Sequence, residues 1–161
     1  SGHQPCMAGD GKEIRKILDL LLHNIMRDLE QMNRMTVGAI EDYLDSILRG
    51  ADKLTENLFY EEKVPAIKDS WESFAVVDCM NPIRDHQSHA VGTILIKLYA
   101  RQNPYGTKNS GKLFEMEKAL NRIIEDADDE HYFITRMGAY ADYDAVNDIF
   151  FDIVQLNLII T

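Results

Sequence analysis

A chain of 161 residues, 45% of them hydrophobic, is long enough to bury the core of one globular domain. Its net charge of −10 at pH 7 argues against a surface that attracts nucleic-acid phosphates from all sides. No apolar run approaches the roughly 18–20 residues needed to cross a bilayer, so we expect no membrane span. Only two cysteines occur, Cys6 and Cys79, and free thiols in a cytoplasmic protein are the simplest interpretation.

Residues 1–10 are small and polar and are interpreted as a disordered tail or the remnant of an expression tag. From residue 11 to residue 33, apolar side chains recur every three or four positions, which predicts a helix. Thr36 is a suitable N-cap for a second helix, whose apolar stripe continues to Leu58. A third helical segment is predicted over residues 64–79, with Pro65 in its first turn.

The pair Asn81-Pro82 predicts the start of a fourth helix that ends near Gln102. Residues 103–111 contain Pro, Gly, Asn and Ser and form the clearest loop in the chain. Two more helices are predicted, over residues 112–127 and 142–160. The sequence therefore predicts an all-α fold, with residues 11–161 as a single-domain bundle of five to six helices.

One part of this acidic chain is basic. No Asp or Glu occurs from His86 to Phe114, and this window contains four basic residues, Lys97, Arg101, Lys108 and Lys112. If they share a face, they form the one surface suited to steering a nucleic acid.

The basic window opens with the densest group of polar chemistry in the chain. Arg84, Asp85, His86 and His89 lie within six residues, next to a predicted helix start. Cleavage of RNA without a metal uses the 2′-OH as nucleophile and needs a group that titrates near neutrality, which His supplies. It also needs a cation for the charge that gathers on the phosphoryl oxygens, and the planar fork of Arg suits that role.

The Arg84-Asp85 pair, followed after three intervening residues by His89, resembles the signature of the HEPN superfamily of all-helical nucleases. The resemblance implies a metal-independent endoribonuclease of the toxin or defence type, acting as a homodimer on RNA, without a cofactor and with an antitoxin or other protein as partner. It implies that Arg84 stabilises phosphoryl charge, that His89 is the general acid or base, and that Asp85 orients the site. His86 is an expected assistant, and the four basic residues are expected to bind substrate.

Two alternatives stand beside this hypothesis. His86 and His89 have the spacing of metal ligands on a helix, but no second pair of ligands is readable, so no metal site is expected. The alternative function is a non-enzymatic, all-helical interaction protein whose acidic surface meets a basic partner, with a secreted helical cytokine as its weaker form. Cleavage of RNA in EDTA, lost in His89→Ala, separates the nuclease from these alternatives.

Overall fold

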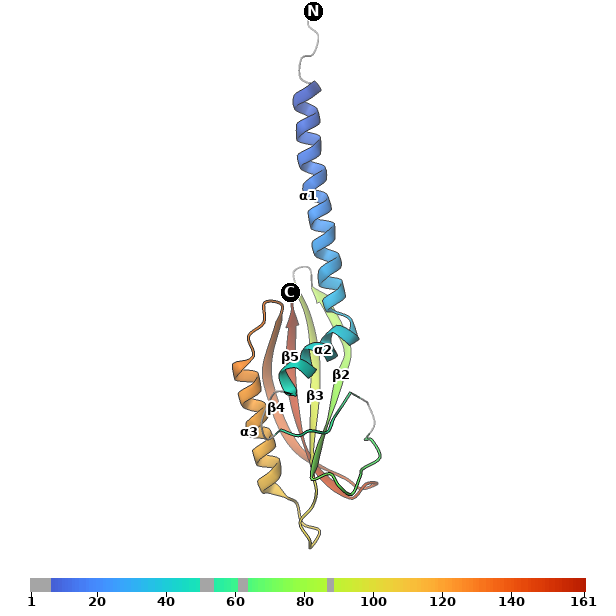
Figure 1. The fold of residues 1–161 in the computed structure, drawn as a ribbon, viewed down its shortest axis with the longest axis vertical. Helices are drawn as coiled ribbons and strands as arrows, with labels where there is room; N and C mark the ends of the chain where they lie inside the picture. The colour runs from blue at the N-terminus through green and yellow to red at the C-terminus, as the bar shows by residue number, and fades with distance from the viewer. Residues whose placement is uncertain (1–6, 50–53, 61–63, 87–88) are drawn as a thin grey trace, which may run out of the picture.

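The computed structural model describes residues 7–49, 54–60, 64–86 and 89–161, and it shows a mixed α/β fold rather than a helical bundle (Figure 1). Five strands form one sheet in the order β1-β2-β3-β5-β4. The helices of the described ranges are α1 (Met7–Arg34), α2 (Val37–Leu48) and α3 (Ser110–Asp126). The strands are β1 (Leu58–Phe59), β2 (Ser73–His86), β3 (His89–Ala100), β4 (Tyr132–Asp144) and β5 (Ile149–Ile160).

The prediction of an all-α bundle is therefore wrong, and so are the functions built on it. A five-stranded sheet conflicts with an all-helical HEPN domain, which removes the basis for the endoribonuclease of the toxin or defence type. The same sheet excludes the alternative of an all-helical interaction protein and its cytokine form. The predicted helices over 64–79, 82–102 and 142–160 are replaced mainly by β2, β3 and β5.

The strands were mistaken for helices because their apolar side chains lie on both faces. On β5 the even-numbered residues from Val154 to Ile160 face the main core, while Ile149, Phe151 and Ile153 are buried on the other side. A strand buried on both faces gives a nearly continuous apolar run, which also satisfies a spacing of three and four. Pro82 does not start a helix; it lies where the pairing of β2 with β3 shifts register, between Met80 and Arg84.

Three of the predicted helices are confirmed, although their ends differ. The helix predicted over 11–33 is α1, and the helix predicted over 112–127 is α3. Thr36 is the N-cap of α2, and its side chain accepts a hydrogen bond from the backbone N–H of Ala39 at 3.2 Å. Helix α2 ends at Leu48, well before Leu58, which instead opens β1.

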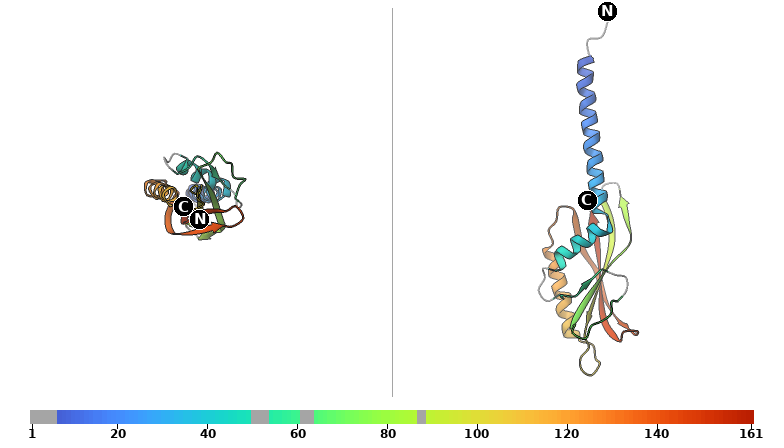
Figure 2. Two further views of the ribbon diagram at one scale, coloured as in Figure 1. Left: turned by 90° about the horizontal axis from the view of Figure 1, so that it is seen from below. Right: turned by 45° about the vertical axis from the view of Figure 1, so that its right-hand side comes forward.

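The main core lies between one face of the sheet and the helices α2 and α3. Helix α2 contributes Ile40, Leu44 and Leu48, and α3 contributes apolar residues such as Met116 and Leu120. The opposite face of the sheet carries a smaller aromatic cluster at the end far from α1, where Phe74, Tyr99 and Phe151 stack in a row. Helix α1 adds nothing to either core and extends away from the domain along the direction of the strands (Figures 1 and 2).

Helix α1 is nonetheless held firmly at its C-terminal end. The Tyr132 hydroxyl donates a hydrogen bond to the carbonyl oxygen of Arg34 at 2.8 Å, and Nε of Arg34 donates to the carbonyl oxygen of Thr161 at 2.9 Å. Tyr132 also stacks on Tyr43 of α2, with ring centroids 4.5 Å apart. These contacts tie the last turn of α1 to α2 and to both β4 and the end of β5, so the helix leaves the domain in a defined direction.

Cys79 of β2 is expected to be unreactive in the folded protein. Burial, together with a smaller effect of the nearby carboxylates of Glu41 and Asp78, raises the pKa of its thiol to about 11. At pH 8 the folded thiol is protonated, whereas an unfolded one, with a pKa near 8.5, is partly thiolate. We expect alkylation of Cys79 at pH 8 to be more than tenfold slower in native protein than in urea, read by peptide mass spectrometry. Equal rates in both would contradict this burial. Cys6 lies outside the described residues.

Candidate assembly interface

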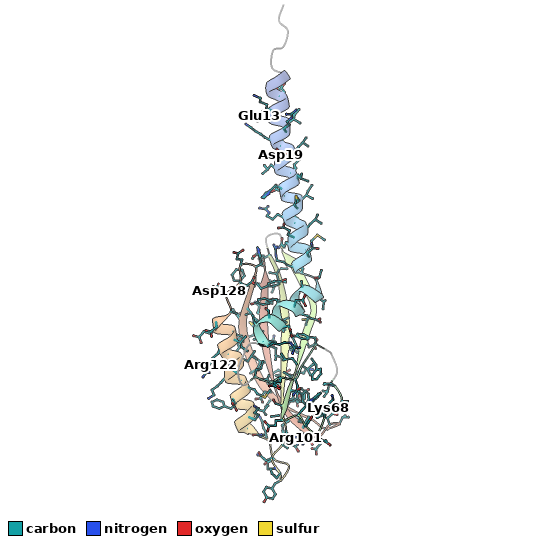
Figure 3. The ribbon with its side chains drawn as sticks, in the orientation of Figure 1. Glu13, Asp19, Lys68, Arg101, Arg122 and Asp128 are labelled. Atoms are coloured by element: carbon teal, nitrogen blue, oxygen red, sulfur yellow. The ribbon has the colours of Figure 1, made fainter. Side chains whose placement is uncertain are left out.

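The most unusual surface of the molecule is a long apolar stripe on α1. Nine large hydrophobic side chains on this helix are each 52–60% exposed: Ile14, Ile17, Leu18, Leu21, Leu22, Ile25, Met26, Leu29 and Met32. Their neighbours Glu13 and Asp19 project into open space from the same isolated helix (Figure 3). Contiguous apolar patches of several hundred Å² are rare on monomers and mark sites of interaction. We call these nine residues the α1 stripe.

The α1 stripe has a width and two distinct edges. At about 100° per residue, its members cover roughly half of the helix circumference, which is wider than the seam of a two-stranded coiled coil. Asp10 and Asp28 lie along one edge of the stripe, whereas Arg15 and Asn33 lie along the other. Leu20, which is 60% exposed, falls on the opposite side of the helix.

The polar face of α1 carries no excess of positive charge. Within Met7–Arg34 there are five basic side chains (Lys12, Arg15, Lys16, Arg27 and Arg34) and five acidic ones (Asp10, Glu13, Asp19, Asp28 and Glu30). Helices that lie on membrane surfaces usually have a polar face rich in Lys and Arg, which bind anionic lipids. Among the residues that the structure describes, no helix is long and apolar enough to cross a bilayer.

The motif singled out in the sequence lies on a β-hairpin. Arg84 pairs with Val91, Asp85 with Ala90, and His86 with His89 across the β2–β3 ladder. The helical spacing that would place Asp85 beside His89 therefore does not exist, because the two residues belong to different strands. His89 is half-buried at the start of β3. The side chains of Arg84, Asp85 and His86 lie outside the described part of the structure.

The four basic residues expected to bind substrate are spread along the other end of the domain. Arg101 follows the last residue of β3, about 40 Å of strand from His89 at roughly 3.3 Å per residue. Lys108 forms an ion pair with Asp152 at 3.3 Å, and Lys112 lies in the first turn of α3. Lys97 is half-buried within β3. The structure does not bring these four side chains together with the hairpin motif.

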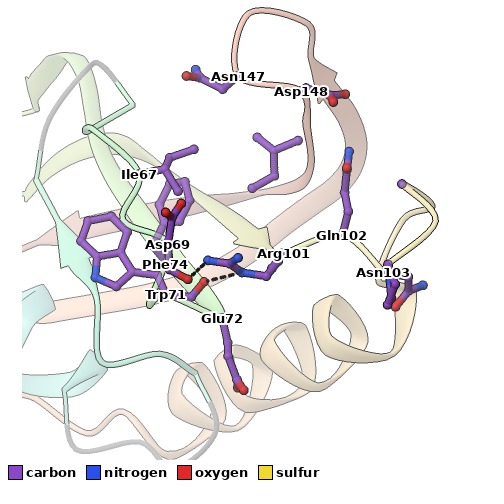
Figure 4. A pocket seen from close by; sticks show the side chains of 13 residues that line it. Ile67, Asp69, Trp71, Glu72, Phe74, Arg101, Gln102, Asn103, Asn147 and Asp148 are labelled. Atoms are coloured by element: carbon purple, nitrogen blue, oxygen red, sulfur yellow. Dashed lines mark hydrogen bonds between the residues drawn. The ribbon is translucent and has the colours of Figure 1, made fainter.

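A cleft of about 510 Å³ opens at the end of the sheet far from α1 (Figure 4). Its walls come from the segment that contains Trp71, from the loop after β3, and from the β4–β5 turn. Arg101 occupies the middle of the cleft, and its guanidinium donates to the backbone carbonyls of Lys68, Asp69 and Trp71. Asp148 in the turn accepts a hydrogen bond from the Tyr143 hydroxyl. Arg101 fastens the segment around Trp71 to the end of β3, and the Tyr143–Asp148 bond holds the β4–β5 turn, so we interpret these polar groups as structural.

The sequence showed the α1 stripe but not its exposure. Seven of its nine residues form the periodic pattern that predicted the first helix, and the pattern itself suggests a face buried in the same domain. The sequence contained one sign of a different role. Leu20 and Met26 widen the apolar surface of the helix beyond a narrow stripe, and the consecutive residues Leu20, Leu21 and Leu22 point to three different sides of the helix. Comparison with known proteins adds no relative, because no family model matches the chain and a search of the curated proteins finds no match.

Proposed function

We propose that this protein is a structural assembly subunit, which forms a homo-oligomer by packing its α1 helices into a parallel bundle. The observation that carries the proposal is the α1 stripe, nine large apolar side chains held in water on a helix that contributes nothing to its own domain's core. The α/β domain at the base of α1 is then the unit that the assembly displays. The domain is presented in a fixed orientation, because the contacts of Tyr132 and Thr161 with Arg34 hold the helix base.

The size of the α1 stripe suits a stable interface. Burying the exposed half of nine such side chains contributes roughly 7–14 kcal/mol per helix, at half of the 1.5–3 kcal/mol for complete burial. At about 25 cal/mol per Å², this corresponds to roughly 600–1,100 Å² of apolar surface on two helices. Since little over half of an interface is apolar, the total overlaps the roughly 1,200–2,000 Å² of stable complexes. An amphipathic helix in a protein gains most of its stability by packing its apolar face against other elements. Because α1 contributes nothing to the core of its own domain, packing against a partner stabilises it.

A second copy fits the stripe better than a lipid surface does. The equal numbers of acidic and basic residues on α1 give anionic lipids no electrostatic attraction, whereas they suit the mixed flanks of packed helices. The width of the stripe favours more than two helices, because a helix inside a larger bundle contacts a neighbour on each side. This extends the homodimer expected above to a homo-oligomer of two or more copies.

The edges of the stripe favour the parallel direction. In a parallel bundle, opposite edges of neighbouring helices meet, so that Asp10 approaches Arg15 of the next copy, five residues further along. In an antiparallel pair, like edges meet, and the acidic edge with Asp10 and Asp28 faces its own counterpart. The Asp10–Arg15 pair stabilises the parallel arrangement, and the repulsion between like carboxylates destabilises the antiparallel one.

Sedimentation velocity of the full chain tests the proposal. We expect a particle of at least twice the 18.5 kDa chain mass at micromolar concentration. The reason is that the free energy gained by burying the α1 stripe exceeds the free-energy cost of association. Vesicles of anionic lipid are added in a parallel sample. A monomer at all concentrations up to about 100 μM, or a monomer that binds the vesicles, would overturn the proposal.

A further inference from the structure

One edge of the sheet is formed by β4, and the other is formed by the short β1 and the part of β2 beyond it. Strand β4 is thirteen residues long and lies at one edge, where among the described residues it pairs with β5 alone. Ile134 is its one buried residue, and the large side chains Phe133, Met137 and Tyr140 are 47–63% exposed. Ala139 and Ala141 are exposed as well, which leaves the backbone beside them open to solvent.

Natural sheets protect such an edge, because unpaired N–H and C=O groups form a template for a further strand. The usual devices are charged side chains (especially Lys) or Pro on the strand, a short edge strand, a bulge, or a helix or loop that covers the edge. Strand β4 contains no Lys and no Pro, and its protective features are one irregularity between Arg136 and Gly138 and the charged side chains of Arg136, Asp142 and Asp144. Its composition, rich in Tyr, Phe, Ile and Thr, favours extended structure. The β4 edge is therefore long and only partly protected, and its unpaired backbone groups can accept a further strand.

The opposite edge of the sheet offers such a partner. Strand β1 pairs with β2 only at Ala75 and Val76, so β2 from Val77 onward faces no other strand on that side within the described residues. The run Val77–Met80 is regular, since the shift in the ladder with β3 comes only after Met80. Among the described residues, each copy of the chain therefore has one unpaired edge on β4 and one on β2.

We propose that β4 of one copy pairs with the free edge of β2 in the neighbouring copy, so that the sheet continues across the subunit boundary. The proposal rests on the parallel α1 bundle proposed above. Helix α1 runs along the strands, so rotation about the bundle axis leaves the direction of every strand unchanged (Figures 1 and 2). Strand β4 is antiparallel to β5, which has the same direction as β2, so β4 beside the neighbour's β2 forms an antiparallel pair.

The two interfaces are also continuous on the molecule. Tyr132, the first residue of β4, contacts Arg34 in the last turn of α1, so the β4 edge begins where the helix base ends. Pairing of β4 with β2 of the next copy joins two different surfaces. Such a contact closes a ring when repeated by rotation, and it gives each subunit two neighbours. This agrees with a stripe that is wide enough for two helix neighbours.

Hydrogen–deuterium exchange, read by mass spectrometry with the oligomer mass measured on the same sample, tests the pairing. The wild type is compared with Leu18→Glu, which is designed to separate the helices, and with Leu20→Glu, which lies off the stripe. In wild type and Leu20→Glu, peptides covering 134–142 and 77–80 are expected to exchange at least about tenfold more slowly than in the Leu18→Glu monomer. Peptides from the centre of β3 are expected to stay protected in all three, which shows that the domain remains folded.

The outcomes separate this inference from the proposed function. If the wild type is oligomeric but β4 exchanges at the monomer rate, the strand pairing is wrong and the helix bundle stands. If β4 is protected while 77–80 is not, β4 pairs with something other than β2, which also overturns the inference. If the wild type is a monomer, both proposals fail.

Discussion

Replacement of Leu18 by Glu is expected to convert the oligomer to a monomer. Leu18 lies within the α1 stripe and is 57% exposed in the isolated chain, so a bundle buries it. In a symmetric parallel bundle, every copy places its new carboxylate at the same level, and each uncompensated buried charge costs about 3–5 kcal/mol. Even in a dimer the two copies together weaken association by at least about 10⁴-fold, at 1.4 kcal/mol per factor of ten.

Leu20→Glu is the matched control for this change. Leu20 belongs to the same helix, has almost the same exposure at 60%, and receives the same new charge, but it lies on the far side from the stripe. We expect Leu20→Glu to keep the wild-type mass in sedimentation velocity at concentrations where Leu18→Glu is a monomer. Loss of the oligomer in both variants, or in neither, would show that the stripe is not the contact surface.

Truncation of Leu156 to Ala is expected to give the largest loss of stability within the domain. Leu156 is fully buried on β5, in the core between the sheet and the helices α2 and α3. Removing a buried Leu side chain costs about 2–5 kcal/mol, since it loses apolar burial and leaves a cavity. Urea unfolding, followed by circular dichroism in the monomeric Leu18→Glu background, measures this change free of linkage to assembly.

Ile159→Ala provides the comparison on the same strand. Ile159 lies on the opposite face of β5 and is only half-buried, so its truncation is expected to cost no more than about 1.5 kcal/mol. A larger loss for Ile159→Ala than for Leu156→Ala would mean that the helix-covered face is not the main core. The difference between the two variants therefore tests the assignment of the sheet's two faces.

The hairpin motif shows how local chemistry misleads when the secondary structure is wrong. Arg84, Asp85 and His89 match a helical nuclease motif by spacing, but spacing has geometric meaning only within a known element. In a hairpin, His86 rather than Asp85 lies opposite His89, so the same letters describe a different arrangement. The resemblance carried the fold, the RNA substrate and the catalytic roles together, and the fold was the part that the structure contradicted.

The sequence by itself determined the helices whose ends are marked by local chemistry. Thr36 and Asn109 accept hydrogen bonds from backbone N–H groups at the starts of α2 and α3, and such caps depend only on neighbouring residues. The apolar stripe of α1 is likewise a local pattern with a period of 3.6. The loop after β3 was also predicted, because Pro and Gly restrict or free the backbone wherever they occur, although α3 begins at Ser110, inside the predicted range of 103–111.

Only the tertiary structure decided that residues 73–86, 89–100 and 149–160 are strands. Their hydrogen-bond partners are far away in the chain, as Ile94 with Leu156 shows, and an apolar run buried on both faces has no period of its own. The tertiary structure also decided that the α1 stripe lies outside the core, because α2 and α3 already cover the apolar face of the sheet on that side. A periodic apolar pattern predicts that one face of a helix is buried. The three-dimensional fold shows whether that face packs within the same chain or is left for another molecule.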